Sequence, residues 1–210
     1  MDGSQNALVQ EFIEKALSVK SRIHEAKDVA SAIDYVLSVC SDKVPSELLY
    51  EEPGTAVEGV GLNGMPARKQ KIIAAPDFSA EEFSLLEKKA ADHQFKCIRE
   101  GLRSYLAGFD VGIEYAAFGA ASTATCMVVT DSEDACLAGM VSEISVILLP
   151  KSRILPNVHA LAEHLKSRQT SSNASFTSFI SGPSYTGDIE NVGVSGVHGP
   201  LELHIILLES

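Results

Sequence analysis

Two segments between residues 180 and 200 carry the residue types from which a small-anion site is built. Ser181–Glu190 reads SGPSYTGDIE and Gly193–Pro200 reads GVSGVHGP. Gly182 permits a positive φ and Pro183 fixes the next φ, so we expect the chain to turn sharply there. The hydroxyl and free N–H groups of such a turn can bind a carboxylate or phosphate, as a helix N-terminus does. We therefore predict ligand-binding roles for Ser181, Gly182, Ser184, Thr186, Gly196 and Gly199.

His198 is the candidate for acid–base chemistry, because imidazole titrates near neutral pH and the flanking glycines leave room for a ligand. Asp188 and Glu190 place two carboxylates at the same mouth and are its predicted catalytic partners. Other interpretations stay open, since His198 could bond a loop carbonyl and the two acids could form a solvated helix start. The three side chains are also compatible with a metal by ligand type, but their spacing does not demand one. We predict neither a metal nor a cofactor.

A third run of small and hydroxylated residues, Gly119–Thr125 (GAASTAT), precedes a buried apolar run. In open parallel sheets, ligands bind at the carboxyl ends of strands, where such loops converge. We expect Ser181–Glu190 and Gly196–Pro200 to face each other across one cleft. The residues predicted to bind ligand on the floor of that cleft are Ser122, Thr123 and Thr125.

The first 70 residues are expected to form a helical extension that ends in a loop. The i, i+4 spacing of apolar residues predicts a helix over 6–25 and another over 28–40, with Asp28 as its N-cap. So short a link predicts an antiparallel pair outside the sheet. Frequent Pro and Gly residues over 41–70 predict a loop. Residues 71–210 are then the main domain.

Residues 71–75 are a short strand candidate that leads into a strong helix signal. Ser79 followed by Glu82 makes a capping box, and Phe78 with Phe83 makes a hydrophobic staple. The apolar pattern predicts a long helix from about residue 80 to Gly108, with a break near residues 92–93.

The remaining chain alternates short apolar runs with helical patterns. Asn157 is expected to cap a helix that continues to about residue 168. Strands apolar on both faces belong to a mainly parallel sheet covered by helices, so we predict a three-layer α/β/α domain. His204 is interpreted as a satisfied core or edge residue of the last strand. The runs predicted as adjacent strands of this one mainly parallel sheet are 126–130, 144–149, 176–180 and 203–208.

Composition sets the outer limits on function. The 210 residues are 45% hydrophobic and carry a formal net charge of −11. Enough apolar surface is present to offset chain entropy, which disfavours a disordered chain. The acidity disfavours binding to nucleic acid or to anionic lipid. Without a basic leader or a long apolar run, a cytoplasmic protein is expected.

The four cysteines lack the spacing that holds zinc or an iron–sulfur cluster. They are Cys40, Cys97, Cys126 and Cys136. We expect reduced, mostly buried thiols and no stoichiometric iron in the purified protein.

Taken in order, these segments resemble the LUD (lactate utilisation) domain family, which contains the LutC-type proteins. The resemblance covers roughly residues 95–208. Ser181–Glu190 is similar to the family's SGPSxTxDIE block, and Gly196–His204 is similar to its GxHGPxELH block. The chain departs from the family's Glu-Thr-Gly-Thr signature, because Ser122-Thr123-Ala124-Thr125 replaces it and lacks both the carboxylate and the glycine.

The resemblance implies a fold like that of sugar-phosphate isomerases and CoA transferases. It also implies a non-redox accessory or small-anion-binding protein, working beside iron–sulfur proteins that oxidise lactate to pyruvate. Fold kinship does not establish activity. A small-molecule isomerase or an acyl or phosphoryl transferase in the same cleft remains open, as does a structural interaction module with no ligand. The sequence also leaves open whether the protein is a homo-oligomer.

Overall fold

The computed structural model describes residues 3–47, 57–60, 64–168, 176–186, 194–196 and 198–209. Its α-helices are α1 (Gly3–Ser18), α2 (Val29–Asp42), α3 (Ala80–Ala91), α4 (Glu133–Val141) and α5 (Val158–Arg168). Its strands are β1 (Arg22–Ala26), β2 (Val57–Val60), β3 (Pro66–Arg68), β4 (Ile72–Ala74), β5 (Lys96–Ile98), β6 (Phe109–Ala120), β7 (Thr125–Thr130), β8 (Ser142–Pro150), β9 (Ile154–Leu155), β10 (Phe176–Ile180), β11 (Tyr185–Thr186), β12 (Val194–Ser195) and β13 (Glu202–Leu208). None of the helices in these ranges combines the length and apolar character needed to cross a bilayer.

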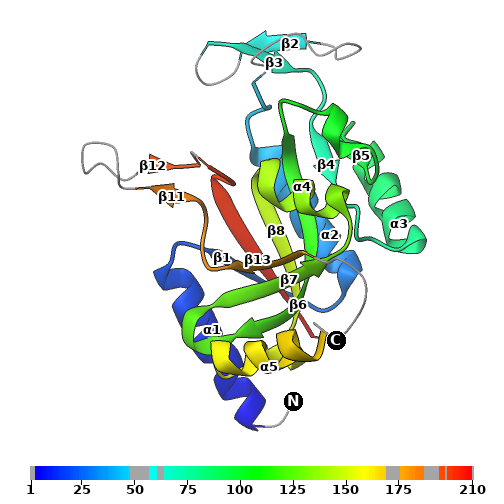
Figure 1. Cartoon of the computed structure of the whole chain (residues 1–210). Coiled ribbons are helices and arrows are strands. Elements are labelled where there is room, and N and C mark those ends of the chain that lie inside the picture. Colours follow the sequence, from blue (N-terminus) through cyan, green and yellow to red (C-terminus); the bar gives the residue numbers. More distant parts are fainter. Residues whose placement is uncertain are drawn as a thin grey trace.

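The main sheet runs in the order β1-β13-β8-β6-β4-β5, and every neighbouring pair along this path is parallel (Figure 1). The predicted α/β architecture with a mostly parallel sheet is confirmed. The prediction for two runs is wrong: β7 lies antiparallel to β6, and β10 lies antiparallel to β7. The reason is that β6 continues beyond Tyr115, where its pairing with β8 ends, and the chain turns back through a short 3-10 helix at Ala121–Thr123, as an antiparallel pair allows.

Helices cover both faces of the sheet. One face packs against α2 and α3 through alternate strand residues such as Val111, Ile113 and Val146. The opposite face packs against α1 through Ile147, Leu149 and their neighbours. α4 lies on this second face beside β6 and β8 (Figure 1). The alternation follows from the two-residue period of a strand, and it explains why the central strands carry apolar residues on both faces.

The expected helical pair outside the sheet is wrong. α1 ends at Ser18, Lys20 adopts a left-handed φ of 64°, and β1 then joins the sheet edge parallel to β13. α1 and α2 therefore pack on opposite faces of the sheet rather than against each other. The division of the chain at residue 70 stays a prediction, although elements on both sides of it share one apolar cluster.

The long helix expected from residue 80 to Gly108 is also wrong beyond its predicted break. α3 ends at Ala91, Gln94 takes a φ of 59°, and β5 follows as a parallel partner of β4. Three local predictions are confirmed. Asp28 caps α2, Ser79 and Glu82 form the capping box of α3, and Asn157 accepts bonds from the first N–H groups of α5.

Candidate functional site

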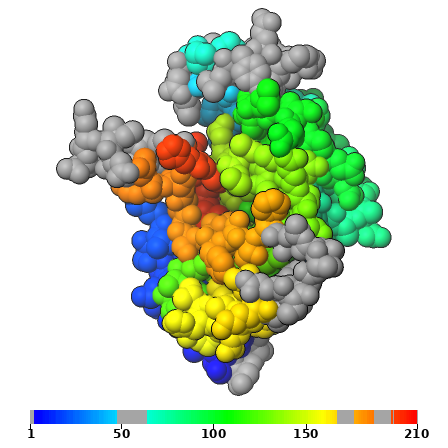
Figure 2. All heavy atoms as spheres, viewed as in Figure 1, coloured from blue at the N-terminus to red at the C-terminus, as the bar shows by residue number. Residues whose placement is uncertain are grey.

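A cavity of about 240 Å³ lies on the face of the sheet that carries α4. Its floor is formed by side chains of β6, β8 and β13, and its walls by α4 and the β7–β10 pair. Its mouth is formed by residues 182–184 and 198–200. In Figure 2 the orange residues of β10 and the following loop lie beside the yellow-green residues of α4. Floor, walls and mouth thus come from elements that are distant in sequence and surround one cavity.

Two polar side chains stand on the floor among apolar neighbours. Glu114 of β6 is 3% exposed and Ser145 of β8 is 2% exposed, and Leu203 of β13 lies beside them in the lining. Within the described part of the chain, neither Oε1 of Glu114 nor Oγ of Ser145 has a hydrogen-bond partner. A buried polar atom left in this state costs about 1–3 kcal/mol. The cavity lining therefore includes two polar side chains, Glu114 and Ser145, whose hydrogen-bonding capacity is not fully used by the described residues.

Gly139 of α4 provides the room for Glu114. A Cβ built on Gly139 would collide with the carboxylate of Glu114. The helix also approaches β6 closely at Gly112, where a Cβ would collide with the carbonyl oxygen of Ala138. Two glycines thus let α4 lie against the strand while a carboxylate occupies the space between them.

Burial raises the pKa of Glu114 to about 8, and the negative charge of Asp77 adds to the shift. The cause is desolvation, which disfavours the charged form of a carboxyl group. Near neutral pH the side chain therefore holds its proton and can donate a hydrogen bond. A carboxyl group with this property at a cavity floor is a candidate for ligand binding or proton transfer.

The mouth of the cavity is built from the two glycine-containing segments. The N–H of Ser184 donates to the carbonyl of Pro200 at 3.0 Å, and the N–H of Gly196 donates to the carbonyl of Ser184 at 2.9 Å. The N–H of His198 donates to Oγ of Ser184 at 3.3 Å. Gly182 turns the chain with a φ of 90°. The segments thus lie side by side.

Four of the predicted residues line the cavity, and all four lie at its mouth: Gly182, Ser184, His198 and Gly199. The exposed position of His198 leaves its imidazole accessible to solvent. The structure therefore brings part of the predicted site together, with His198 at the entrance rather than on the floor.

The residues predicted for the floor lie off this cavity, and their ligand-binding role stays a prediction. Ser122, Thr123 and Thr125 do not line the cavity, because the strands β6, β8 and β13 supply the floor instead. Thr125 Oγ1 lies 2.7 Å from Thr123 Oγ1 and 2.6 Å from Ser181 Oγ, so these hydroxyls bond to one another. This chain of hydroxyls joins the β6–β7 turn to the end of β10.

Two other predicted ligand contacts also lie off the cavity lining. Thr186 pairs with Val194 in the β11–β12 ladder. Gly196 has a φ of 78°, and a Cβ there would collide with the side chain of Leu201. Asp188 and Glu190 lie outside the described residues. Their pairing with His198 as a catalytic group stays a prediction.

All four cysteines are free thiols, as predicted. Burial raises the pKa of Cys40 and of Cys97 to about 12, and it raises the pKa of Cys126 and Cys136 as well. Cys136 lines the cavity from α4. The raised values favour the protonated thiol at neutral pH.

Reasoning from the sequence missed Glu114 and Ser145, which are the most buried polar residues of the site. Both lie inside strands, whereas the glycine and hydroxyl motifs used to predict the site are typical of loops. The available signal was Glu114 itself, one of two acids in the otherwise apolar run FDVGIEYAAFG. Such an acid is rarely buried unless it is paired or functional.

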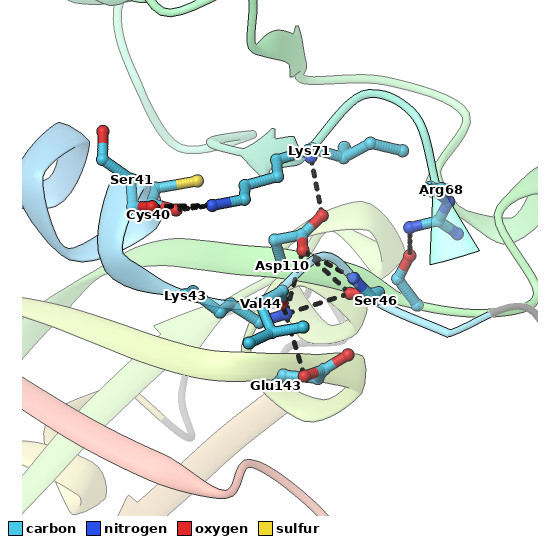
Figure 3. Close-up of polar contacts among 11 residues, drawn as sticks. Cys40, Ser41, Lys43, Val44, Ser46, Arg68, Lys71, Asp110 and Glu143 are labelled. Atoms are coloured by element: carbon cyan, nitrogen blue, oxygen red, sulfur yellow. Dashed lines mark hydrogen bonds and ion pairs between the residues drawn. The ribbon is translucent and has the colours of Figure 1, made fainter. Parts of the chain in front are cut away.

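A second buried carboxylate of β6 has a different environment (Figure 3). Asp110 Oδ1 accepts from Lys43 Nζ at 2.9 Å and from the N–H and hydroxyl of Ser46 at 3.1 and 2.9 Å. Its Oδ2 accepts from the N–H of Ile72 at 2.8 Å. Lys43 also pairs with Glu143 of β8 at 2.9 Å. This network joins the end of α2 to the starts of β4, β6 and β8.

His204 matches its interpretation as a satisfied core residue. Its ring is fully buried, with Nδ1 at 2.9 Å from the hydroxyl of Tyr35 and Nε2 at 2.9 Å from Glu202. Desolvation lowers its pKa, which favours the neutral imidazole.

Comparison with known proteins places these features in a family. A model of the LUD domain matches residues 9–208. The Escherichia coli (strain K12) protein named Uncharacterized protein YkgG is 37% identical over 101 residues, which are 47% of this chain and 44% of that protein. Lactate utilization protein C of Halalkalibacterium halodurans is 30% identical over 102 residues, which are 48% of this chain and 44% of that protein. The chain thus aligns with less than half the length of these curated relatives.

A solved structure extends the likeness to the whole fold. The crystal structure of a DUF162 family protein from Deinococcus radiodurans matches with a TM-score of 0.57 and 13% sequence identity. The match covers 97% of this chain and 98% of that chain. The helices and the mostly parallel sheet are therefore an arrangement shared with a known protein.

Proposed function

This chain belongs to the LUD domain family and is related to proteins named Lactate utilization protein C, and on that premise we propose that it binds a small anionic metabolite as a non-redox component of a lactate utilisation system. The metabolite occupies the cavity between α4, β10 and the central strands. Its first candidates are lactate and pyruvate. In this proposal the protein is cytoplasmic, and iron–sulfur proteins of the same system carry the electrons.

The observation that carries the proposal is the polar floor of an otherwise apolar cavity. Glu114 and Ser145 are buried, and within the described residues Oε1 and Oγ of these side chains lack hydrogen-bond partners. Val128, Ile180 and Leu203 supply apolar walls. Ligand sites combine these features, with few polar groups fixing the orientation of the ligand and apolar surface excluding water.

The mouth adds groups that suit an anion. The hydroxyl of Ser184 and the imidazole of His198 lie where a ligand must pass. The family block that contains His198 is thus placed at the entrance. We infer that His198 contributes to affinity or turnover while contributing little to stability, because its side chain is exposed.

Isothermal titration calorimetry with sodium L-lactate, sodium pyruvate and ribose 5-phosphate tests the proposal. One of the two monocarboxylates is expected to bind and to raise the melting temperature. A ligand at 100 times its Kd stabilises the folded state by about 2.7 kcal/mol. His198→Ala is expected to weaken binding with an unchanged melting temperature.

His159→Ala is the matched control, because His159 is an exposed histidine of α5. It should bind as the wild type does. No binding of any of the three probes would leave the cavity as part of a structural interaction module. A large drop in the melting temperature of His198→Ala with binding intact would make His198 structural.

An enzyme remains the second candidate, and Glu114 is the observation that favours it. A carboxyl group with a pKa of about 8 can both donate and accept a proton near neutral pH. An isomerase or an acyl or phosphoryl transferase could use this property. Tighter binding of ribose 5-phosphate than of the monocarboxylates, together with turnover lost in Glu114→Gln, would support the enzyme.

A further inference from the structure

The charges around the cavity are unusual for an anion site. The described residues that line it include no lysine or arginine. Its titratable lining groups are Glu114, the thiol of Cys136 and the imidazole of His198. An ionised carboxylate bound on this floor would meet a second carboxyl group with no cation to separate the two. Two carboxylates in one site cannot both ionise readily, so one of them holds a proton.

The surroundings of Glu114 indicate which of the two carboxyl groups, that of Glu114 or that of the ligand, carries this proton. Asp77, in the connection between β4 and α3, acts on Glu114 as a negative charge. Cys136 on α4 and Cys126 on β7 face it as protonated thiols. Among the described residues no donor bonds Oε1 of Glu114. Nothing in this set stabilises an ionised Glu114, whereas a small hydroxy or keto acid is already ionised at neutral pH.

We infer that the cavity binds a small monocarboxylate together with one proton, which the carboxyl group of Glu114 carries. The inference rests on the proposed function and adds the chemistry of its ligand. Glu114 donates its O–H to the ligand's carboxylate, and the hydroxyl of Ser145 supplies a second donor on the same floor. Hydrogen bonds between a neutral acid and a carboxylate are short and strong. Dianions, such as phosphate esters, then bind more weakly than monocarboxylates.

Proton-linked binding has a defined signature. Where Glu114 is already protonated, binding takes up no proton and the affinity does not change with pH. Above the pKa of Glu114, near 8, the affinity for a monocarboxylate falls about tenfold for each further pH unit. Each bound ligand then takes up close to one proton from the solvent. A cationic ligand would show the opposite trend, because it requires the ionised carboxylate.

The test is calorimetry with sodium L-lactate and sodium pyruvate from pH 7.0 to 9.5, in buffers of different ionisation enthalpy. The wild type should lose about tenfold in affinity between pH 7 and 9 and take up nearly one proton at pH 9. The wild-type measurement needs no variant, so it stands even if a substitution unfolds the chain.

Two substitutions separate Glu114 from other groups. Glu114→Gln keeps a neutral donor and should bind at pH 9 as tightly as at pH 7, without proton uptake. Asp77→Asn removes a nearby negative charge and should move the loss of affinity to a lower pH. Glu163→Gln, on the exposed side of α5, is the matched control and should retain the wild-type profile.

The outcomes distinguish the two proposals. Binding whose affinity is constant or rises from pH 7 to 9.5 would overturn the proton-linked site and leave the proposed function standing. A pH dependence that persists unchanged in Glu114→Gln would also overturn it, because another group would carry the proton. The absence of binding by either monocarboxylate at every pH would overturn both proposals.

Discussion

Asp110 and Glu114 are both carboxylates of β6, and their side chains are 0% and 3% exposed. Asp110 accepts hydrogen bonds from Lys43, Ser46 and Ile72, so both of its oxygens are occupied. Glu114 lines a cavity, and within the described residues its Oε1 is without a partner. Burial therefore does not by itself tell what an acid does.

The environments of the two acids determine their roles. Asp110 has a cation and several donors, which satisfy both of its oxygens and stabilise the contacts among three strands and a helix. Glu114 has apolar neighbours and a nearby acid, which favour the neutral form. A satisfied acid supports the fold, whereas an unsatisfied one costs stability unless a ligand completes it. This difference makes measurable predictions about stability.

The largest effect is expected for Asp110→Ala. Removal of one partner of a buried pair takes from Lys43 one of its two carboxylate partners and leaves the N–H groups of Ser46 and Ile72 without their acceptor, which costs about 3–5 kcal/mol. Urea unfolding followed by circular dichroism measures the change. Glu114→Gln, the matched substitution on the same strand, should cost much less. Equal losses for the two variants would break the comparison.

A smaller effect is expected for Gly139→Ala. The new Cβ would collide with the carboxylate of Glu114, and overpacking of this kind costs about 1–3 kcal/mol. In a Glu114→Ala background the collision partner is absent, and alanine is the better helix former. A double-mutant cycle therefore should show strong coupling between the two sites. Additive effects would mean that the absence of a side chain at Gly139 is not what makes room for Glu114.

The smallest effect is a slope of stability against pH. The pKa of Glu114 is about 8 in the folded protein and 4.5 for a free carboxyl group. Between these values the unfolded chain releases a proton that the folded chain retains, so stability falls as pH rises and levels off above 8. From pH 6.5 to 7.5 the wild type should lose about 1 kcal/mol more than Glu114→Gln. Parallel profiles for the two proteins would show that Glu114 is ionised.

Local signals predicted the fold best. The helix starts at Ser79 and Asn157 depend on side-chain bonds within three residues, so the sequence contains the whole interaction. β1 could not be recognised in this way, because Ile23 also continues the apolar face of the preceding helix. Its extended shape depends on β13, a distant partner. The sequence pattern predicts helix over β5 for the same reason, since the extended shape of β5 depends on its pairing with β4.

In the candidate site, too, the residues placed by local turns were predictable and those placed by long-range strand pairing were not. Gly182 and His198 reach the mouth through short turns whose residue types are visible in sequence. Glu114 and Ser145 reach the floor because β6 and β8 pair in register, with Gly112 opposite Ser145 and Glu114 opposite Ile147. That register depends on packing across the whole sheet. The entrance of the cavity was therefore predictable, and its floor was not.

The pairing of β1 with β13 also sets the order in which the molecule can fold. Arg22 and Glu202, which form an ion pair across these two strands, are 180 residues apart in the sequence. During synthesis β1 has no pairing partner until β13 has left the ribosome. Until then α1 and α2 flank a strand whose backbone hydrogen bonds are not yet made. Strand pairs so far apart in sequence form slowly, and until they form their unpaired edges can associate with other chains. Substitutions that weaken the pairing of β1 with β13 should therefore first lower the yield of folded protein, because the chain aggregates during synthesis.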